Sequence, residues 1–232
     1  MFDQPEPTDL TPRHIQAGSL YVVVSVQSAD ALNYRRETSP SLTQQRILQG
    51  LLEHKNSGLY WDLYLHHDNG LGTLYRYLVE NGNAQRVDRL SVLRHVKNIL
   101  NVEYLIGIVR VMDFGPEMAD RVDRFIATSQ PPDAIKDTVN WCFTMLGAVE
   151  KKVREDCRFP GRPLAPPTIN IQNIHDEVAH FAGQHIESAL RGKKPRPILN
   201  LWTRIWVTPG DGTGSVVEPV TPRSGAPTPD SI

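Results

Sequence analysis

Cys142 is the residue of this sequence that is best suited to nucleophilic chemistry. It follows Asp137, a possible helix cap, by five positions, so its thiol is predicted in the first turn of a helix or just beyond it. The dipole at a helix N-terminus stabilises a thiolate, and an adjacent histidine can act as its base. His66 and His67 are the candidate bases. This set supports one hypothesis, a cysteine-dependent hydrolase or acyltransferase.

The same cysteine also fits a structural role. Apolar residues recur in alternating steps of four and three over residues 135–153, which predicts an amphipathic helix. The stripe consists of Ile135, Val139, Cys142, Leu146, Val149 and Val153. Because Cys142 lies within this stripe, and buried cysteines are common and inert in protein cores, the periodicity favours the structural role.

The histidines late in the sequence do not have the spacing of a metal site. His175, His180 and His185 follow one another at intervals of five residues. Five residues turn a helix by about 140°, whereas two ligands four residues apart share a face. Glu177 and His180 do share a face, but one such pair needs partners from a second helix. We therefore predict no metal.

The glycine-rich segments do not indicate a cofactor. Gly70 and Gly72 lack the third glycine of a phosphate-binding loop, and they stand in a predicted hairpin. Residues 210–214 hold three glycines, but no helix is expected after them. Both segments are predicted to be turns, and no cofactor is predicted.

The elements that must position these residues are predicted as strands first and helices second. Residues 20–26 form a nearly unbroken β-branched run, which is typical of a strand buried on both faces. Two alternating runs, 59–67 and 73–79, are joined by an Asn-Gly turn and predict a hairpin. Further strands are predicted at 85–93 and 104–112, and further helices at 41–54, 117–128 and 172–191.

The alternation in 59–67 separates the two candidate bases. Successive side chains of a strand point to opposite faces, so His66 and His67 cannot both join one site. His67 shares its predicted face with Trp61 and Leu65.

This order of elements predicts an α+β fold, with a mostly antiparallel sheet packed by helices. No flexible linker interrupts residues 18–191, which predicts a single domain. Residues 1–17 are predicted to be a flexible N-terminal segment. The Pro- and Gly-rich tail, 192–232, is predicted to dock on the domain around 199–206 and to be disordered elsewhere. Trp202 and Trp206 lie in the docking part, and they could instead bind a protein partner.

Composition and charge narrow the classes of partner. The chain has 25 Lys and Arg against 26 Asp and Glu, which argues against a nucleic-acid partner. No apolar run approaches the roughly 20 residues of a membrane span, so no membrane partner is predicted. Two cysteines fit a reducing compartment, and we predict a cytoplasmic protein. The basic cluster at 191–196 leaves nuclear import as an alternative.

Three short segments resemble an uncharacterised family of small fungal proteins. They are the hairpin strand 60–65, the strand 105–109 and the helix entered through Asn140, Trp141 and Cys142, and the resemblance covers roughly residues 18–191. The family pattern has a His-Trp pair on the hairpin strand and an Asn-Cys pair opening the helix. It implies a permuted papain-like core, similar to that of NlpC/P60 proteins, with a Cys–His dyad.

This chain departs from the family pattern at both pairs. Tyr60 stands in place of the histidine, and Trp141 separates Asn140 from Cys142. A tyrosine cannot serve as the base that neutral imidazole provides near pH 7. The resemblance therefore implies either that the dyad is lost or that His66 or His67 replaces the missing base.

The leading hypothesis follows from that resemblance. Related fungal genes stand in part beside biosynthetic genes, which implies a non-catalytic or accessory protein, such as a small-molecule-binding component of secondary metabolism. The cysteine-dependent enzyme and the tryptophan-mediated interaction module are the alternatives.

Overall fold

The computed structural model of this chain describes residues 15–27, 49, 59–67, 71–81, 86–102, 104–130, 137–157, 170–192, 196–201 and 205–207. The strands are β1 (Ser19–Val26), β2 (Leu59–His66), β3 (Leu71–Asn81), β4 (Arg86–Lys97), β5 (Leu105–Asp113), β6 (Ile198–Asn200) and β7 (Ile205–Val207). The helices are α3 (Pro116–Thr128), α4 (Thr138–Cys157) and α5 (Ile171–Leu190), with a short 3-10 turn, η2 (Ile99–Asn101).

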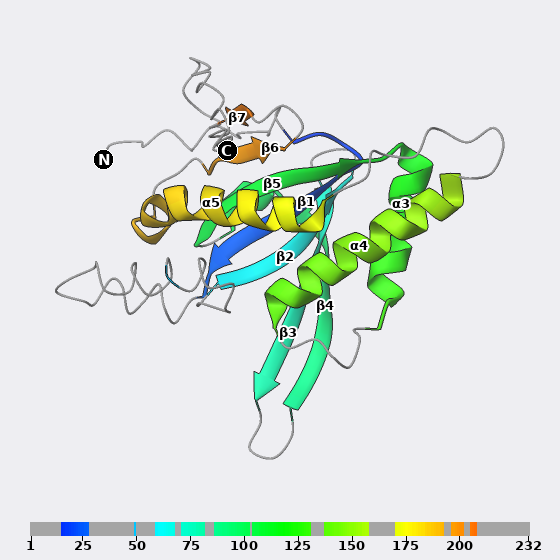
Figure 1. Ribbon diagram of the computed structural model, residues 1–232, viewed down its shortest axis with the longest axis horizontal. Coiled ribbons are helices and arrows are strands. Elements are labelled where there is room, and N and C mark those ends of the chain that lie inside the picture. The colour runs from blue at the N-terminus through cyan, green and yellow to red at the C-terminus, as the bar shows by residue number, and fades with distance from the viewer. Residues whose placement is uncertain are drawn as a thin grey trace, which may run out of the picture.

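All the strands of the described residues belong to one sheet, in the order β4-β3-β2-β1-β5-β6-β7 (Figure 1). Every neighbouring pair is antiparallel except β5 and β6, which are parallel. The three described helices cover this sheet, α5 in front of β1 and β5 and α4 in front of β2 and β3 (Figure 1). This arrangement confirms the predicted α+β fold with a mostly antiparallel sheet.

β1 is the central strand that its β-branched run predicted. It pairs with β2 on one side and β5 on the other, and all eight of its residues are buried. Burial on both faces explains why its sequence is almost continuously apolar.

β2 shows the predicted alternation, and each of its faces joins a different core cluster. One face packs under the helices through Leu59, Trp61, Leu63 and Leu65. On the other face Tyr64 joins a smaller apolar cluster. Gly72 lies in β3 rather than in the predicted turn, and it allows the close approach of the Tyr64 ring, since a Cβ there would stand 2.3 Å from that ring. The predicted turn at 68–70 lies outside the described residues.

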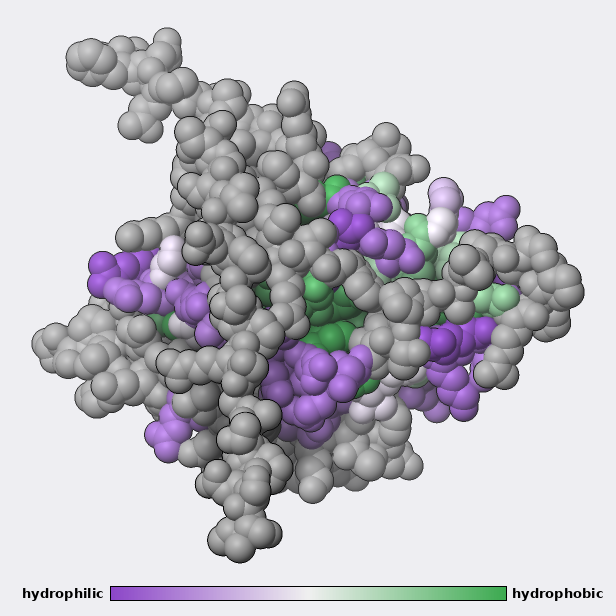
Figure 2. Space-filling model, turned by 45° about the horizontal axis from the view of Figure 1, so that its top comes forward, coloured by the Kyte–Doolittle hydropathy of each residue, from purple (hydrophilic) through white to green (hydrophobic). Residues whose placement is uncertain are grey.

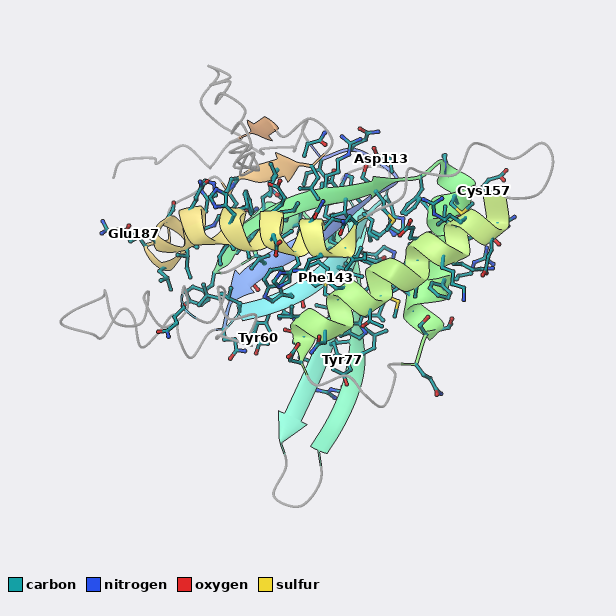
Figure 3. The ribbon with its side chains drawn as sticks, viewed as in Figure 1. Tyr60, Tyr77, Asp113, Phe143, Cys157 and Glu187 are labelled. Atoms are coloured by element: carbon teal, nitrogen blue, oxygen red, sulfur yellow. The ribbon has the colours of Figure 1, made fainter. Side chains whose placement is uncertain are left out.

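α4 carries the predicted apolar stripe into the core. Cys142, Leu146, Val149 and Val153 are all buried, as the stepwise spacing predicts. The helix begins at Thr138 and runs four residues beyond Val153 to Cys157, which lies at its far end (Figure 3). Its start is capped as expected, since the Asp137 carboxylate accepts a hydrogen bond from the Asn140 backbone N–H at 2.8 Å.

The segments beside the predicted domain limits join the domain. Ile15 is buried, and the Gln16 N–H donates to the Tyr21 hydroxyl at 2.8 Å, so the packed region begins before residue 18. After α5, residues 198–200 and 205–207 extend the sheet as β6 and β7. Residues 1–14, most of the predicted helix 41–54 and the tail 208–232 lie outside the described residues.

The surface of the described part is largely hydrophilic. Leu93, 49% exposed, is its one large exposed hydrophobic side chain. On the face seen in Figure 2, a hydrophobic area lies near the middle with hydrophilic residues below it. In the basic cluster 191–196, Arg196 is only 2% exposed. No described helix has the length and apolar character needed to cross a membrane.

Candidate functional site

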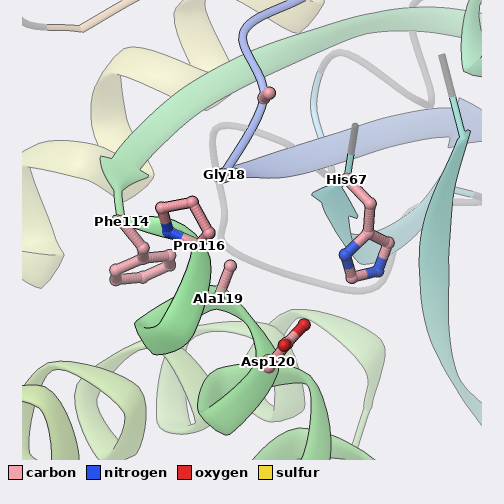
Figure 4. Close-up of a pocket in the computed structure, with 7 residues that line it drawn as sticks. Gly18, His67, Phe114, Pro116, Ala119 and Asp120 are labelled. Atoms are coloured by element: carbon pink, nitrogen blue, oxygen red, sulfur yellow. The ribbon is translucent and has the colours of Figure 1, made fainter. Parts of the chain in front are cut away.

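A cavity of about 370 Å³ opens at the end of the sheet where β1 begins, β2 ends and α3 starts. Seven residues from these three regions line it, namely Ala17, Gly18, His67, Phe114, Pro116, Ala119 and Asp120. The volume lies within the range of sites for small organic molecules. Among the described lining residues, His67 and Asp120 have the polar side chains, and Figure 4 shows them on different sides of the same space.

The upper wall of the cavity depends on a glycine. Gly18 has φ +72°, and its N–H donates to the His66 carbonyl at 2.8 Å while its own carbonyl accepts from the Phe114 N–H at 2.7 Å. A Cβ at this position would stand 2.3 Å from the Phe114 carbonyl oxygen. Only glycine meets both demands, and the result is that the ends of β1, β2 and β5 are tied together.

α3 forms the opposite wall. Gly115 precedes the helix, and Pro116 opens it with a ring that suits the first helical position. The N–H groups of Met118 and Ala119 both donate to the Gly115 carbonyl, at 3.0 Å and 2.9 Å. Asp120 follows on the exposed face of the helix, and its carboxylate points into the cavity (Figure 4).

His67 is held by a chain of hydrogen bonds that reaches back into the protein. Its Nε2 lies 3.0 Å from Thr73 Oγ1. The Thr73 hydroxyl lies on the same face of β3 as Tyr75, and its interaction with the Tyr75 hydroxyl lowers the pKa of that phenol. Tyr75 in turn donates to Asp123 Oδ1, while Arg94 donates to Asp123 Oδ2 at 2.6 Å. We call these five residues the His67 relay.

The directions of these hydrogen bonds determine which nitrogen of neutral His67 carries the proton. A carboxylate only accepts, so the Tyr75 proton goes to Asp123 and the Tyr75 oxygen must accept from Thr73. Thr73 has then used its single proton, and its oxygen can only accept from His67 Nε2–H. We therefore predict that neutral His67 carries its proton on Nε2 and keeps the lone pair on Nδ1. Figure 4 shows a ring nitrogen of His67 on the side that faces α3.

Asp123 fixes the far end of the relay because it is ionised. Burial alone would raise the pKa of Asp123, but the hydrogen bonds from Tyr75 and Arg94 outweigh that effect and hold this pKa below its usual value. Burial and the hydrogen bond to Asp123 together raise the pKa of Tyr75 far above its usual value, which keeps the phenol protonated. The Asp123 carboxylate thus anchors the relay as an acceptor, and the Tyr75 phenol and the Arg94 guanidinium stay protonated as its donors.

A β-bulge brings Arg94 into the relay. Between the pairs Gly72–Val96 and Leu74–Leu93, β3 has one residue, Thr73, where β4 has two, Arg94 and His95. His95 takes the left-handed conformation, with φ +59°. Such a bulge turns a side chain away from its regular direction, and bulges are frequent beside functional sites.

Cys142 lies in the core, away from this cavity. It is fully buried in the main core cluster. Burial raises the pKa of its thiol, and the nearby charge of Asp62 raises it further. Its neighbour Trp141 stacks on Tyr77, with ring centroids 6.0 Å apart. A thiol in this environment stays protonated, which is the opposite of an activated nucleophile.

The structure does not assemble the predicted dyad. His66 points to the other face of the sheet, where its Nδ1 lies 2.9 Å from the Tyr64 hydroxyl. His67 follows the end of β2 and lies level with Leu71 at the start of β3, six residues along β3 from Tyr77, which is a separation of about 20 Å. Figure 3 shows Tyr77 near the start of α4 and Asp113 at the opposite end of the sheet.

The other predicted site residues have structural contacts. Asn140 is exposed, and its side-chain amide donates to Asp137 at 3.3 Å, so it completes the helix cap. Trp206 lies in β7, where its backbone pairs with Leu199. Trp202 lies outside the described residues.

The histidines of α5 contact neighbouring side chains. His175 stacks on Trp61 at 5.7 Å between ring centroids, and His180 lies 2.9 Å from the amide of Gln184. Within the described ranges, no three metal-ligating side chains gather.

Comparison with known proteins identified no similar family, curated protein or solved structure.

Sequence reasoning found His67 but not its partners. The predicted hairpin already placed His67 and Thr73 near one turn, and alternation put Tyr75 on the same face as Thr73. From those positions the sequence could have predicted that Thr73 and Tyr75 lie near His67. Asp123 and Arg94 come from α3 and a bulge, which no local pattern indicates.

Proposed function

We propose that this protein is a non-catalytic small-molecule-binding protein whose site is the cavity beside His67. The observation that carries the proposal is the His67 relay, which orients one polar ring toward a cavity whose walls combine apolar side chains with exposed polar atoms. Binding sites typically combine apolar side chains with a few polar groups held in place by a second layer of hydrogen bonds.

The composition of the cavity lining supports binding rather than covalent catalysis. Among the described residues that line the cavity, none is a serine, threonine, cysteine or lysine, and the hydroxyl of Thr73 is engaged with His67 Nε2. The thiol of Cys142 is buried elsewhere. The accessory role in fungal secondary metabolism and the cytoplasmic location stay predictions.

Fragment binding tests this proposal. In saturation-transfer NMR with the full-length protein and a library of fragments of about ten heavy atoms, we expect several hits. At about 0.4 kcal/mol per atom, such a fragment has a Kd of about 1 mM. Asp120→Trp, which places an indole over the cavity, should abolish the signals of these hits.

Thr144→Trp is the matched control, since Thr144 is an equally exposed helical position, on α4 and outside the cavity. It should leave every hit unchanged. A library without hits, or hits that both variants retain, would overturn the proposed function.

A further inference from the structure

Among the described residues, the lining of the cavity offers mainly hydrogen-bond acceptors. In the predicted tautomer His67 presents the Nδ1 lone pair, with its proton on Nε2 toward Thr73. Asp120 presents a carboxylate. These are the two polar side chains of the described lining, and in neutral His67 both accept.

Several backbone N–H groups around the cavity are already used within the fold. The N–H groups of Gly18, His67 and Phe114 are bonded to the carbonyls of His66, Leu71 and Gly18. Pro116 has no N–H, and that of Ala119 is used within α3.

The start of α3 is also a poor anion site. Helix N-termini attract anions through free N–H groups and the helix dipole. Here Pro116 removes one donor, Gly115 accepts from two others, and Glu117 already places a carboxylate in the first turn. Asp120 adds a second negative charge one turn further on. An anionic ligand would meet repulsion with little compensation.

From these observations, and resting on the proposed function, we infer that the ligand is an organic amine that binds as its ammonium ion. Its N–H groups donate to His67 Nδ1 and to the Asp120 carboxylate. Its apolar part lies against Phe114, Pro116 and the methyl groups of Ala17 and Ala119. A Phe ring near a cation adds a further attraction.

A charge-matched series tests the class of ligand. The probes are 2-phenylethylamine, 2-phenylethanol and phenylacetate, which share an aromatic body and differ in the charge of the polar end. Their Kd values are measured by chemical-shift titration of the full-length protein. We expect the amine to bind at least about fivefold more tightly than either of the others, as for a charge-assisted hydrogen bond.

Asp120→Asn keeps the size of the side chain and removes its charge. It should weaken amine binding about fivefold and leave 2-phenylethanol unchanged. Asp176→Asn is the control, because Asp176 is an exposed aspartate on α5, and it should change neither Kd.

The outcomes separate the two proposals. If phenylacetate or the alcohol binds in the cavity as tightly as the amine, the ligand class is wrong and the binding function stands. If none of the three probes binds, the inference is tested with the library fragments whose binding Asp120→Trp abolishes. It is supported if those fragments are cations, and it is overturned if they are anions or neutral molecules. If no fragment is displaced, the proposed function itself fails.

Discussion

Replacing Trp141 by alanine is expected to lower the free energy of unfolding by about 3–5 kcal/mol, as for other buried aromatic side chains. The indole is fully buried in the main core cluster and stacks on Tyr77 with an interplanar angle of 8°. Its removal leaves a cavity between α4 and β3 and exposes the face of Tyr77 to that void. Urea denaturation followed by circular dichroism measures the loss.

Trp141→Phe separates packing from polarity. The Trp141 Nε1–H is buried and has no hydrogen-bond partner among the described residues. Phenylalanine keeps an aromatic ring over Tyr77 and removes this unsatisfied donor, so its loss should stay below about 2 kcal/mol. If alanine costs less than about 1 kcal/mol, or no more than phenylalanine, then the stacked pair does not stabilise the core as described.

Iodoacetamide is expected to modify Cys142 only when the protein unfolds. Burial and the charge of Asp62 raise the pKa of this thiol, and no reagent can reach it in the folded state. With a stability of 5 kcal/mol or more, native labelling should be slower than that of the unfolded chain by about 10³-fold or more. A Cys157→Ser background isolates the signal of Cys142.

Cys142→Ser adds an independent readout. A hydroxyl with few partners in this core should destabilise the protein by about 1–3 kcal/mol, whereas Cys142→Ala should cost less because it buries no polar group. Fast labelling of the native protein below pH 7 would contradict this account. It would place the cysteine-dependent hydrolase first among the functions.

The parts of the fold that were predictable carry a strong local periodicity. The β-branched run of β1 follows directly from burial on both faces. β2 is also almost entirely buried, and its alternation separates an apolar face under the helices from a face that carries Asp62, Tyr64 and His66. The apolar stripe of α4 likewise identified its buried face, with Cys142 in the middle. In each case the pattern of apolar residues is set by the same contacts that stabilise the element.

Other features depend on contacts between distant segments. β6 has three residues, too few for a period, and its parallel pairing with β5 follows from the crossover through α5. The His67 relay joins β2, β3, β4 and α3, and its anchor Asp123 resembles any other helical aspartate in the sequence. The bulge at Arg94 and His95 interrupts β4 without a glycine to mark it.

His67 is expected to present an unprotonated Nδ1 to the cavity. Long-range ¹H–¹⁵N correlation NMR of the ring nitrogens measures this directly in the full-length protein, with His67→Gln used to assign the signals. At a pH where His67 is neutral, we predict a protonated Nε2 and a bare Nδ1, and Tyr75→Phe, which breaks the relay, should mix the two tautomers. A proton found on Nδ1 in the unmodified protein would contradict the relay and, with it, the acceptor-lined site.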